Sequence, residues 1–195
     1  MIINFVSIFS VILLGITSTF LFIGQKWRWS MISLALQYLS VFWLVSLVWS
    51  LPMSTVKLVV GWMVTAIIGA SQPGEDYVED KFPGNAGVII RLLSVVMVAL
   101  VVASLVPFLG SIIQTGMVTL WGGLILIGMG LLQLGMTTRV SRIILGLFTL
   151  LAGFEILYAV VERSVLVAGL LAVINLGLAM VGSYLLAIPT WEKTP

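Results

Sequence analysis

Seven long apolar stretches, separated by short polar breaks, dominate the hydrophobic pattern of this 195-residue chain. A helix needs about 20 mostly apolar residues to cross the hydrocarbon core of a bilayer. Inside the bilayer a helix also satisfies its own backbone hydrogen bonds. We therefore predict an all-α, polytopic transmembrane helix bundle with spans at Ile3–Ile23, Trp29–Trp49, Thr55–Ser71, Val88–Leu109, Gly116–Leu134, Ile143–Val161 and Val165–Ile188.

The breaks between these stretches differ in strength. Ser50–Ser54 contains Pro52, and Gln72–Gly87 contains three glycines and two prolines, which are strong signals for turns and loops. The break at Gly110–Thr115 is short and polar only in part. Six spans in place of seven therefore stay open as an alternative.

The whole chain, 1–195, is predicted to be one transmembrane domain with an internal parallel repeat. The segment WRWSMISLALQYLSVFWLV aligns with TRVSRIILGLFTLLAGFEI at an offset that places Arg28 on Arg139 and Ser30 on Ser141. Units separated by four helices keep the same orientation in the membrane. The expected organisation is a first three-helix unit (1–71), an acidic loop (72–87), a linking helix (88–109), a second three-helix unit (112–188) and a tail (189–195).

Basic residues in the short connections predict the orientation. Lys26 and Arg28 follow the first span, Arg139 and Arg142 follow the fifth, and Lys81 and Lys193 fall on the same side if seven spans are correct. Lys and Arg concentrate in cytoplasmic loops. We expect a multi-pass protein of the cell inner (plasma) membrane with its N-terminus outside and its C-terminus in the cytoplasm.

Composition narrows the function. The chain is 61% hydrophobic and 8% charged, with a mean hydropathy of +1.25, whereas soluble domains are about 25% charged. It contains no His and no Cys, so the usual ligands of zinc and iron–sulfur clusters are missing. Of the usual haem ligands there are nine Met residues, which we expect to pack on membrane helices, and we predict no cofactor. The net charge of +2 comes from basic residues scattered at helix ends, which gives no reason to expect nucleic acid as a partner.

No catalytic constellation or metal motif is visible, so we expect no enzyme activity from the chain alone. The loop GEDYVEDKFPGN carries four carboxylates, but their spacing is not that of a calcium loop. A solvated loop or a contact with a basic partner explains them.

Glu155 is the main candidate for chemistry, because it lies well inside the sixth span. A charge at such depth costs about 2.5–3.5 kcal/mol on insertion scales, so these residues face protein, water or a partner. One interpretation is proton transfer. The other is a neutral carboxyl that only hydrogen-bonds to a neighbouring helix.

Lys57 and the uncharged polar residues have two interpretations as well. The Lys57 side chain could extend to the membrane surface, or it could stay buried and pair with a carboxylate. Interhelical hydrogen bonds are the default explanation for Gln37, Tyr38, Gln133 and Asn175. Glu155, Lys57 and Gln37 together are our candidates for a proton path.

Small residues predict close helix contacts, and tryptophans predict membrane interfaces. The glycines of the fifth span and the pairs Ala66/Ala70 and Ala179/Ser183 would let helices approach closely. Trp27, Trp29, Trp49 and Trp191 fall near span ends, as expected for an interfacial belt.

The second half resembles subunit K of bacterial complex I and the K-like membrane subunits of energy-converting hydrogenases. The resemblance rests on RVSRIILGLFTLLAG, a basic turn leading into a helix, and on GLAMVGSYLL from Gly177. The seven-span length is most similar to the E-type membrane component of hydrogenase-4-type formate hydrogenlyase, in which an early Arg-x-Ser precedes a Gln, as Arg28, Ser30 and Gln37 do here.

The resemblance implies a place in a membrane arm, between antiporter-like subunits and the redox arm. It also implies two membrane glutamates on a polar axis that carries protons. Here Phe148 and Val173 stand at those positions. Glu155, seven residues beyond Phe148, lies two turns further along the same helix face.

We expect a non-redox integral membrane subunit of a complex-I-like or hydrogenase-type arm that helps to build or line a proton-translocation path. Its partners would be antiporter-like and redox-arm subunits and the lipid bilayer. A small stand-alone transporter or channel is one alternative, although no paired buried charges or broken helices are evident in the sequence. A purely structural or assembly subunit is the other.

Overall fold

The computed structural model describes residues 2–24, 26–71, 85–112, 116–162 and 164–187. Within them the chain forms seven helices, each long and apolar enough to cross a membrane: α1 (Ile2–Ile23), α2 (Trp27–Ser46), α3 (Leu51–Ala70), α4 (Asn85–Ile112), α5 (Met117–Met136), α6 (Val140–Val161) and α7 (Val165–Ala187). The prediction of a seven-helix transmembrane bundle is confirmed, and the six-span alternative is wrong. The acidic loop up to residue 84 and the tail 189–195 lie outside the described residues.

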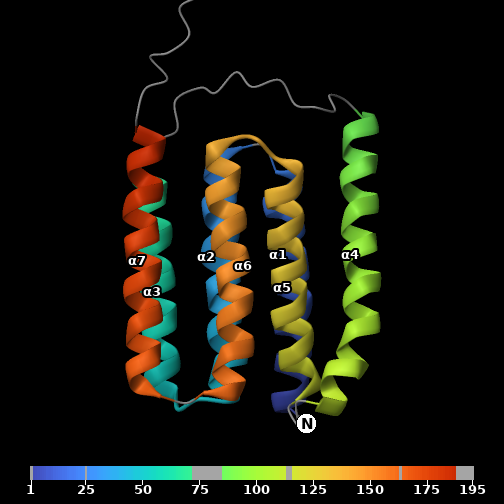
Figure 1. The fold of residues 1–195 in the computed structure, drawn as a ribbon, viewed down its shortest axis with the longest axis vertical. Helices are drawn as coiled ribbons and strands as arrows, with labels where there is room; N and C mark the ends of the chain where they lie inside the picture. Colours follow the sequence, from blue (N-terminus) through green and yellow to red (C-terminus); the bar gives the residue numbers. More distant parts are fainter. Residues whose placement is uncertain (1, 25, 72–84, 113–115, 163, 188–195) are drawn as a thin grey trace, which may run out of the picture.

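Two prolines lie near helix ends that differ from the prediction, and the one in α3 marks the largest difference. Pro52 lies in the first turn of α3, where its missing N–H would have no partner in any case. The helix therefore begins at Leu51 and not at Thr55. Pro107 lies inside α4, which continues past Leu109 to Ile112 and bends near that end (Figure 1), as expected where a backbone hydrogen bond is lost.

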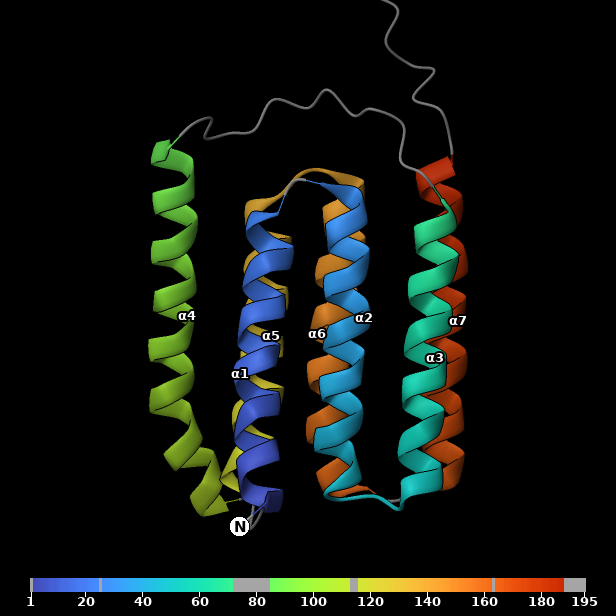
Figure 2. The ribbon, with the colours of Figure 1, turned by 180° about the vertical axis from the view of Figure 1, so that it is seen from behind.

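The helices form two layers with α4 at one edge (Figures 1 and 2). α1, α2 and α3 make one layer and α5, α6 and α7 the other, so that α1 contacts α5, α2 contacts α6 and α3 contacts α7. Corresponding helices run in the same direction (Figure 1). This arrangement has the order and direction that a parallel repeat of three-helix units requires.

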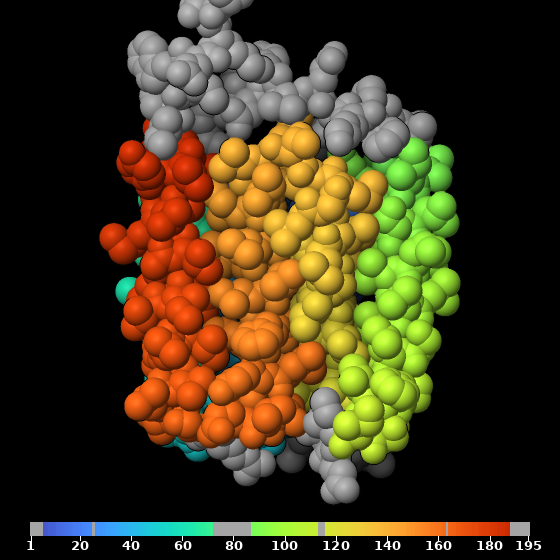
Figure 3. All heavy atoms as spheres, in the orientation of Figure 1, coloured from blue at the N-terminus to red at the C-terminus, as the bar shows by residue number. Residues whose placement is uncertain are grey.

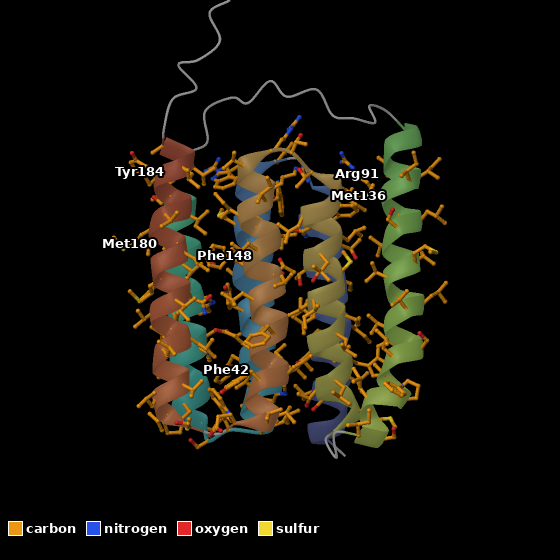
Figure 4. The ribbon with its side chains drawn as sticks, in the orientation of Figure 1. Phe42, Arg91, Met136, Phe148, Met180 and Tyr184 are labelled. Carbon is orange, nitrogen blue, oxygen red and sulfur yellow. The ribbon has the colours of Figure 1, made fainter. Side chains whose placement is uncertain are left out.

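Most of the described basic residues gather at one end of the bundle. The α1–α2 turn, with Lys26 and Arg28, and the α5–α6 turn, with Arg139 and Arg142, both lie at the upper end in Figure 1. Arg91 is near the same end of α4 (Figure 4). We call this the basic end. Among the described Lys and Arg residues, only Lys57 belongs to the opposite half.

Glycines bring the backbones of α5 and α6 into direct contact. A Cβ on Gly153 would lie 2.7 Å from both the carbonyl oxygen of Gly123 and the backbone nitrogen of Ile127. A Cβ on Gly130 would lie 2.6 Å from the backbone nitrogen of Leu150. The predicted packing role of the α5 glycines is therefore confirmed.

Two long side chains hold helix ends together across the layers. Arg142, at the start of α6, donates hydrogen bonds to the carbonyl oxygens of Phe22 and Gly24 at 2.9 and 2.7 Å. At the other end of the bundle, the Trp49 indole N–H donates to the carbonyl oxygen of Ala159 at 2.9 Å. Each contact satisfies carbonyl groups that a helix C-terminus leaves without partners.

Trp49 does not take the interfacial place that we predicted for it. Its side chain is buried in the core, because the indole fits over the end of α6 and donates its N–H there. Trp29, in contrast, is exposed, as an interfacial residue would be. Trp191 lies outside the described residues.

The outer surface of the bundle is almost entirely apolar. α7, α6, α5 and α4 form one face as adjacent bands (Figure 3), and Met180 and Tyr184 project outward from α7 (Figure 4). Within α4, the buried large side chains are Val102 and Val106. Such a surface suits lipid, which makes this a multi-pass membrane protein in contact with the bilayer.

We expect Gly153→Ala to destabilise the bundle by about 1–3 kcal/mol, because the added methyl meets backbone atoms that cannot move aside. Gly177→Ala is the matched control, since nothing lies within 4 Å of a Cβ at that position. The control should be neutral or gain up to about 1 kcal/mol from helix propensity. Unfolding of both variants in mild detergent measures the difference, and equal stabilities would contradict the close α5–α6 contact.

Candidate functional site

A buried ion pair joins the two layers of the bundle. The ammonium Nζ of Lys57, on α3, lies 2.7 Å from the carboxylate Oε1 of Glu155, on α6. The two side chains are 4% and 2% exposed. Both charges are thus removed from lipid and water, and each neutralises the other, as required of charged groups at such depth.

Asn175, on α7, completes the cluster. Its amide Nδ2 donates a hydrogen bond of 2.6 Å to the same carboxylate oxygen, Oε1, and the residue is 2% exposed. Three helices therefore meet at one oxygen atom. We call Lys57, Glu155 and Asn175 the polar cluster.

The polar cluster lies well inside the span, nearer to the end opposite the basic end. Lys57 is six residues after the start of α3 at Leu51, and Glu155 is six residues before the end of α6 at Val161. At 1.5 Å per residue, each is about 9 Å from that end. Asn175, ten residues after Val165, is about 15 Å from it.

This geometry decides between the two interpretations of Lys57. Extension of its side chain to the membrane surface is excluded by its burial and by the contact with Glu155. The alternative, a buried Lys that pairs with a carboxylate, is the correct one. The expectation that the chain lacks paired buried charges, which spoke against a transporter, is wrong.

Tyr38 of α2 packs beside the cluster. Its ring lies so close to α3 that a Cβ on Gly61 would be 2.3 Å from it, and Gly61 is one helical turn beyond Lys57. The Tyr38 hydroxyl group is buried without a hydrogen-bond partner.

Gln37 is buried but is not hydrogen-bonded to the cluster. Its side chain is 0% exposed, and both its amide nitrogen and its amide oxygen lack partners. Leu44, which lies two turns further along the same helix face, packs against the position of Gly122 on α5. Of our three candidates, the structure brings Glu155 and Lys57 into contact and gives Gln37 no hydrogen bond to either.

The two positions that the family resemblance singled out have different surroundings. Phe148 is fully buried near the middle of α6 (Figure 4), whereas Val173 on α7 is 67% exposed. The buried polar residue of α7 is Asn175 instead, two residues further on. From the sequence, Asn175 was predicted only to need a hydrogen-bond partner, because it is a polar residue within an apolar helix. The sequence did not identify Glu155 as that partner.

Comparison with known proteins adds no relative: no family model, no curated protein and no solved structure matches this chain.

The ion pair should show strong coupling between its two members. Lys57→Met alone or Glu155→Gln alone leaves one buried charge without its counterpart, which typically costs about 3–5 kcal/mol. The double variant removes both charges and should lie much closer to the wild type. Unfolding measurements on the four proteins in one detergent give the coupling energy.

The matched control for this cycle pairs Glu155→Gln with Lys26→Met, which removes an exposed Lys. These two changes should be additive. Additive effects for Lys57→Met and Glu155→Gln as well would contradict the contact.

Proposed function

We propose that this chain is a non-redox integral membrane subunit of a proton-translocating assembly of the complex-I-like or energy-converting hydrogenase type. The observation that carries the proposal is the Lys57–Glu155 pair, buried within the membrane span and held at 2.7 Å between two layers of helices. Ionisable residues inside membrane helices typically mark ion pathways and proton relays.

The chemistry of the pair suits such a role. An ammonium and a carboxylate in contact can exchange one proton and become an amine and a carboxylic acid, and the pair stays neutral overall. Both forms are therefore tolerable at low polarity, where a single unpaired charge is not. The pair can store a proton in either partner without creating a net buried charge.

The resemblance to K-like subunits supports the assignment to this class of assembly, although the carboxylate lies at a different position in this chain. Phe148 and Val173 occupy the two positions at which those subunits carry glutamates. In our proposal Glu155 supplies the missing carboxylate at another depth of the same helix, and Lys57 is its partner from the first half of the chain.

The distribution of charge supports the proposed orientation. With Lys57 engaged inside the span, the remaining described Lys and Arg residues lie toward the basic end. We propose that this end faces the cytoplasm, with the N-terminus outside and the C-terminus inside, in the inner (plasma) membrane. The proposed neighbours are antiporter-like and redox-arm subunits.

Glu155→Gln should abolish or strongly reduce proton translocation by the intact assembly while leaving electron transfer measurable. The amide keeps the shape of the side chain and can accept the hydrogen bond from Asn175, but it cannot carry a proton. Proton uptake into vesicles that contain the assembly measures the effect.

Glu162→Gln is the control, because the Glu162 side chain is exposed at the end of α6. It should translocate protons at the wild-type rate. Normal assembly together with unchanged translocation in Glu155→Gln would overturn the proposed role.

Purification of the chain from its native membrane in mild detergent tests the assembly itself. We expect antiporter-like and iron–sulfur subunits to co-purify with it. A monodisperse homo-oligomer would contradict the proposal and favour a stand-alone transporter, the second candidate. The buried ion pair supports that candidate too, since charged residues inside membrane spans also mark the substrate and ion pathways of transporters.

A further inference from the structure

Only one end of the Asn175 amide forms a hydrogen bond. Its Nδ2 donates to Glu155 Oε1 at 2.6 Å, while its carbonyl oxygen Oδ1 is buried without any hydrogen-bond partner. A buried acceptor with no donor is unfavourable, and within a membrane span no bulk water is at hand to satisfy it. The residue nevertheless stands beside the one buried carboxylate of the described residues.

A donor for Asn175 Oδ1 becomes available when Glu155 is protonated. An ionised carboxylate only accepts hydrogen bonds, whereas a carboxylic acid also donates one through its O–H. An asparagine amide presents a donor at one end and an acceptor at the other. If the amide rotates by half a turn, the carbonyl oxygen Oδ1 takes the place of Nδ2. The amide then accepts the O–H of the acid where it had donated an N–H to the carboxylate.

We propose that Asn175 is a positioning residue that holds Glu155 in both protonation states by exchanging the two ends of its amide. In the state that the structure shows, Nδ2 donates to the carboxylate beside the Lys57 ammonium. In the other state, Oδ1 accepts the O–H of the acid. The inference rests on the proposed function, because it requires Glu155 to gain and lose a proton.

The proton for the second state comes from within the pair. One Nζ–H bond of Lys57 breaks and one O–H bond forms on Glu155, which leaves an amine and a carboxylic acid and needs no other reactant. Once Asn175 Oδ1 holds the acid O–H, the proton is directed away from the amine. Lys57 is then a neutral amine that no longer shares this proton, and the pair as a whole stays neutral.

Few other groups could take this role. Lys57 on α3 contacts Glu155, and the titratable Tyr38 on α2 packs against Gly61, one helical turn from Lys57. α5 carries no titratable residue, and on α7 the titratable Tyr184 is exposed. Asn175 is the uncharged partner, so it can follow a change of protonation without adding a charge.

Infrared difference spectroscopy on the assembly that purifies with the full chain tests the inference. The probe is the carboxylic C=O stretch of protonated Glu155 after a pH jump, assigned by its loss in Glu155→Gln. Asn175→Leu removes both ends of the amide and should shift this band to higher frequency. It should also slow proton translocation by about tenfold, since a hydrogen bond to a charged group is lost.

Two further variants separate positioning from simple helix attachment. Asn175→Thr keeps a hydroxyl that can donate and accept, so it should retain most of the wild-type band position and rate. Asn175→Thr also allows the band position and the rate to be tested if Asn175→Leu does not fold. Ser183→Ala removes the hydroxyl contact between Ser183 on α7 and Ser71 at the end of α3, and it should change neither the band nor the rate.

The outcomes distinguish this inference from the proposed function. A Glu155 band that stays at the wild-type frequency in both Asn175 variants overturns the positioning role and leaves the proposed function intact. The absence of any Glu155 band in the wild-type assembly overturns the proposed function itself. A shift in Asn175→Leu that Asn175→Thr reverses supports both.

Discussion

A charged side chain within a membrane span must reach water or meet a charge of opposite sign, and here that requirement links α3 to α6. Lys57 and Glu155 each lie about 9 Å from the end of the bundle, where an unpaired charge is unfavourable. They form an ion pair with each other at 2.7 Å. Because α3 belongs to the first layer and α6 to the second, the pair fixes how the two layers face one another.

The rest of the bundle brings these two side chains together. The α5–α6 backbones touch through glycines, which sets the position of α6 within its layer. Arg142 and Trp49 tie helix ends of one layer to the other at opposite ends of the molecule. Gly61 leaves room for the Tyr38 ring to pack against α3, one turn from Lys57. The polar cluster thus lies in a framework that depends on close contact at small residues.

The sequence predicted the helices well because hydrophobic length alone identifies a membrane span. Most helix ends differ from the prediction by a few residues, and the largest difference is at Pro52, where the effect of a proline depends on its place within the helix. The site was predicted only in part. Glu155 and Lys57 stood out as charged residues in apolar stretches. Because they are 98 positions apart, no local sequence pattern predicts that they are in contact.

Side-chain direction explains the remaining differences. Nothing in the local sequence of Trp49 shows that its indole turns inward to the end of α6, because that end comes from a helix more than 100 residues later. The role of Asn175 depends on the face of α7 that packs against α6, which periodicity does not resolve in a helix that is apolar on every side. In each case the missing information is three-dimensional.

The distance between Lys57 Nζ and the Glu155 carboxylate carbon is the central quantity, and solid-state NMR can measure it in lipid bilayers with ¹⁵N-lysine and ¹³C-glutamate labels. The Lys57→Met variant assigns the signal. We expect a strong ¹⁵N–¹³C dipolar coupling that is present in the wild type and absent in that variant. A wild-type protein without this coupling, in a sample that is folded and membrane-inserted, would contradict the buried pair and the function proposed for it.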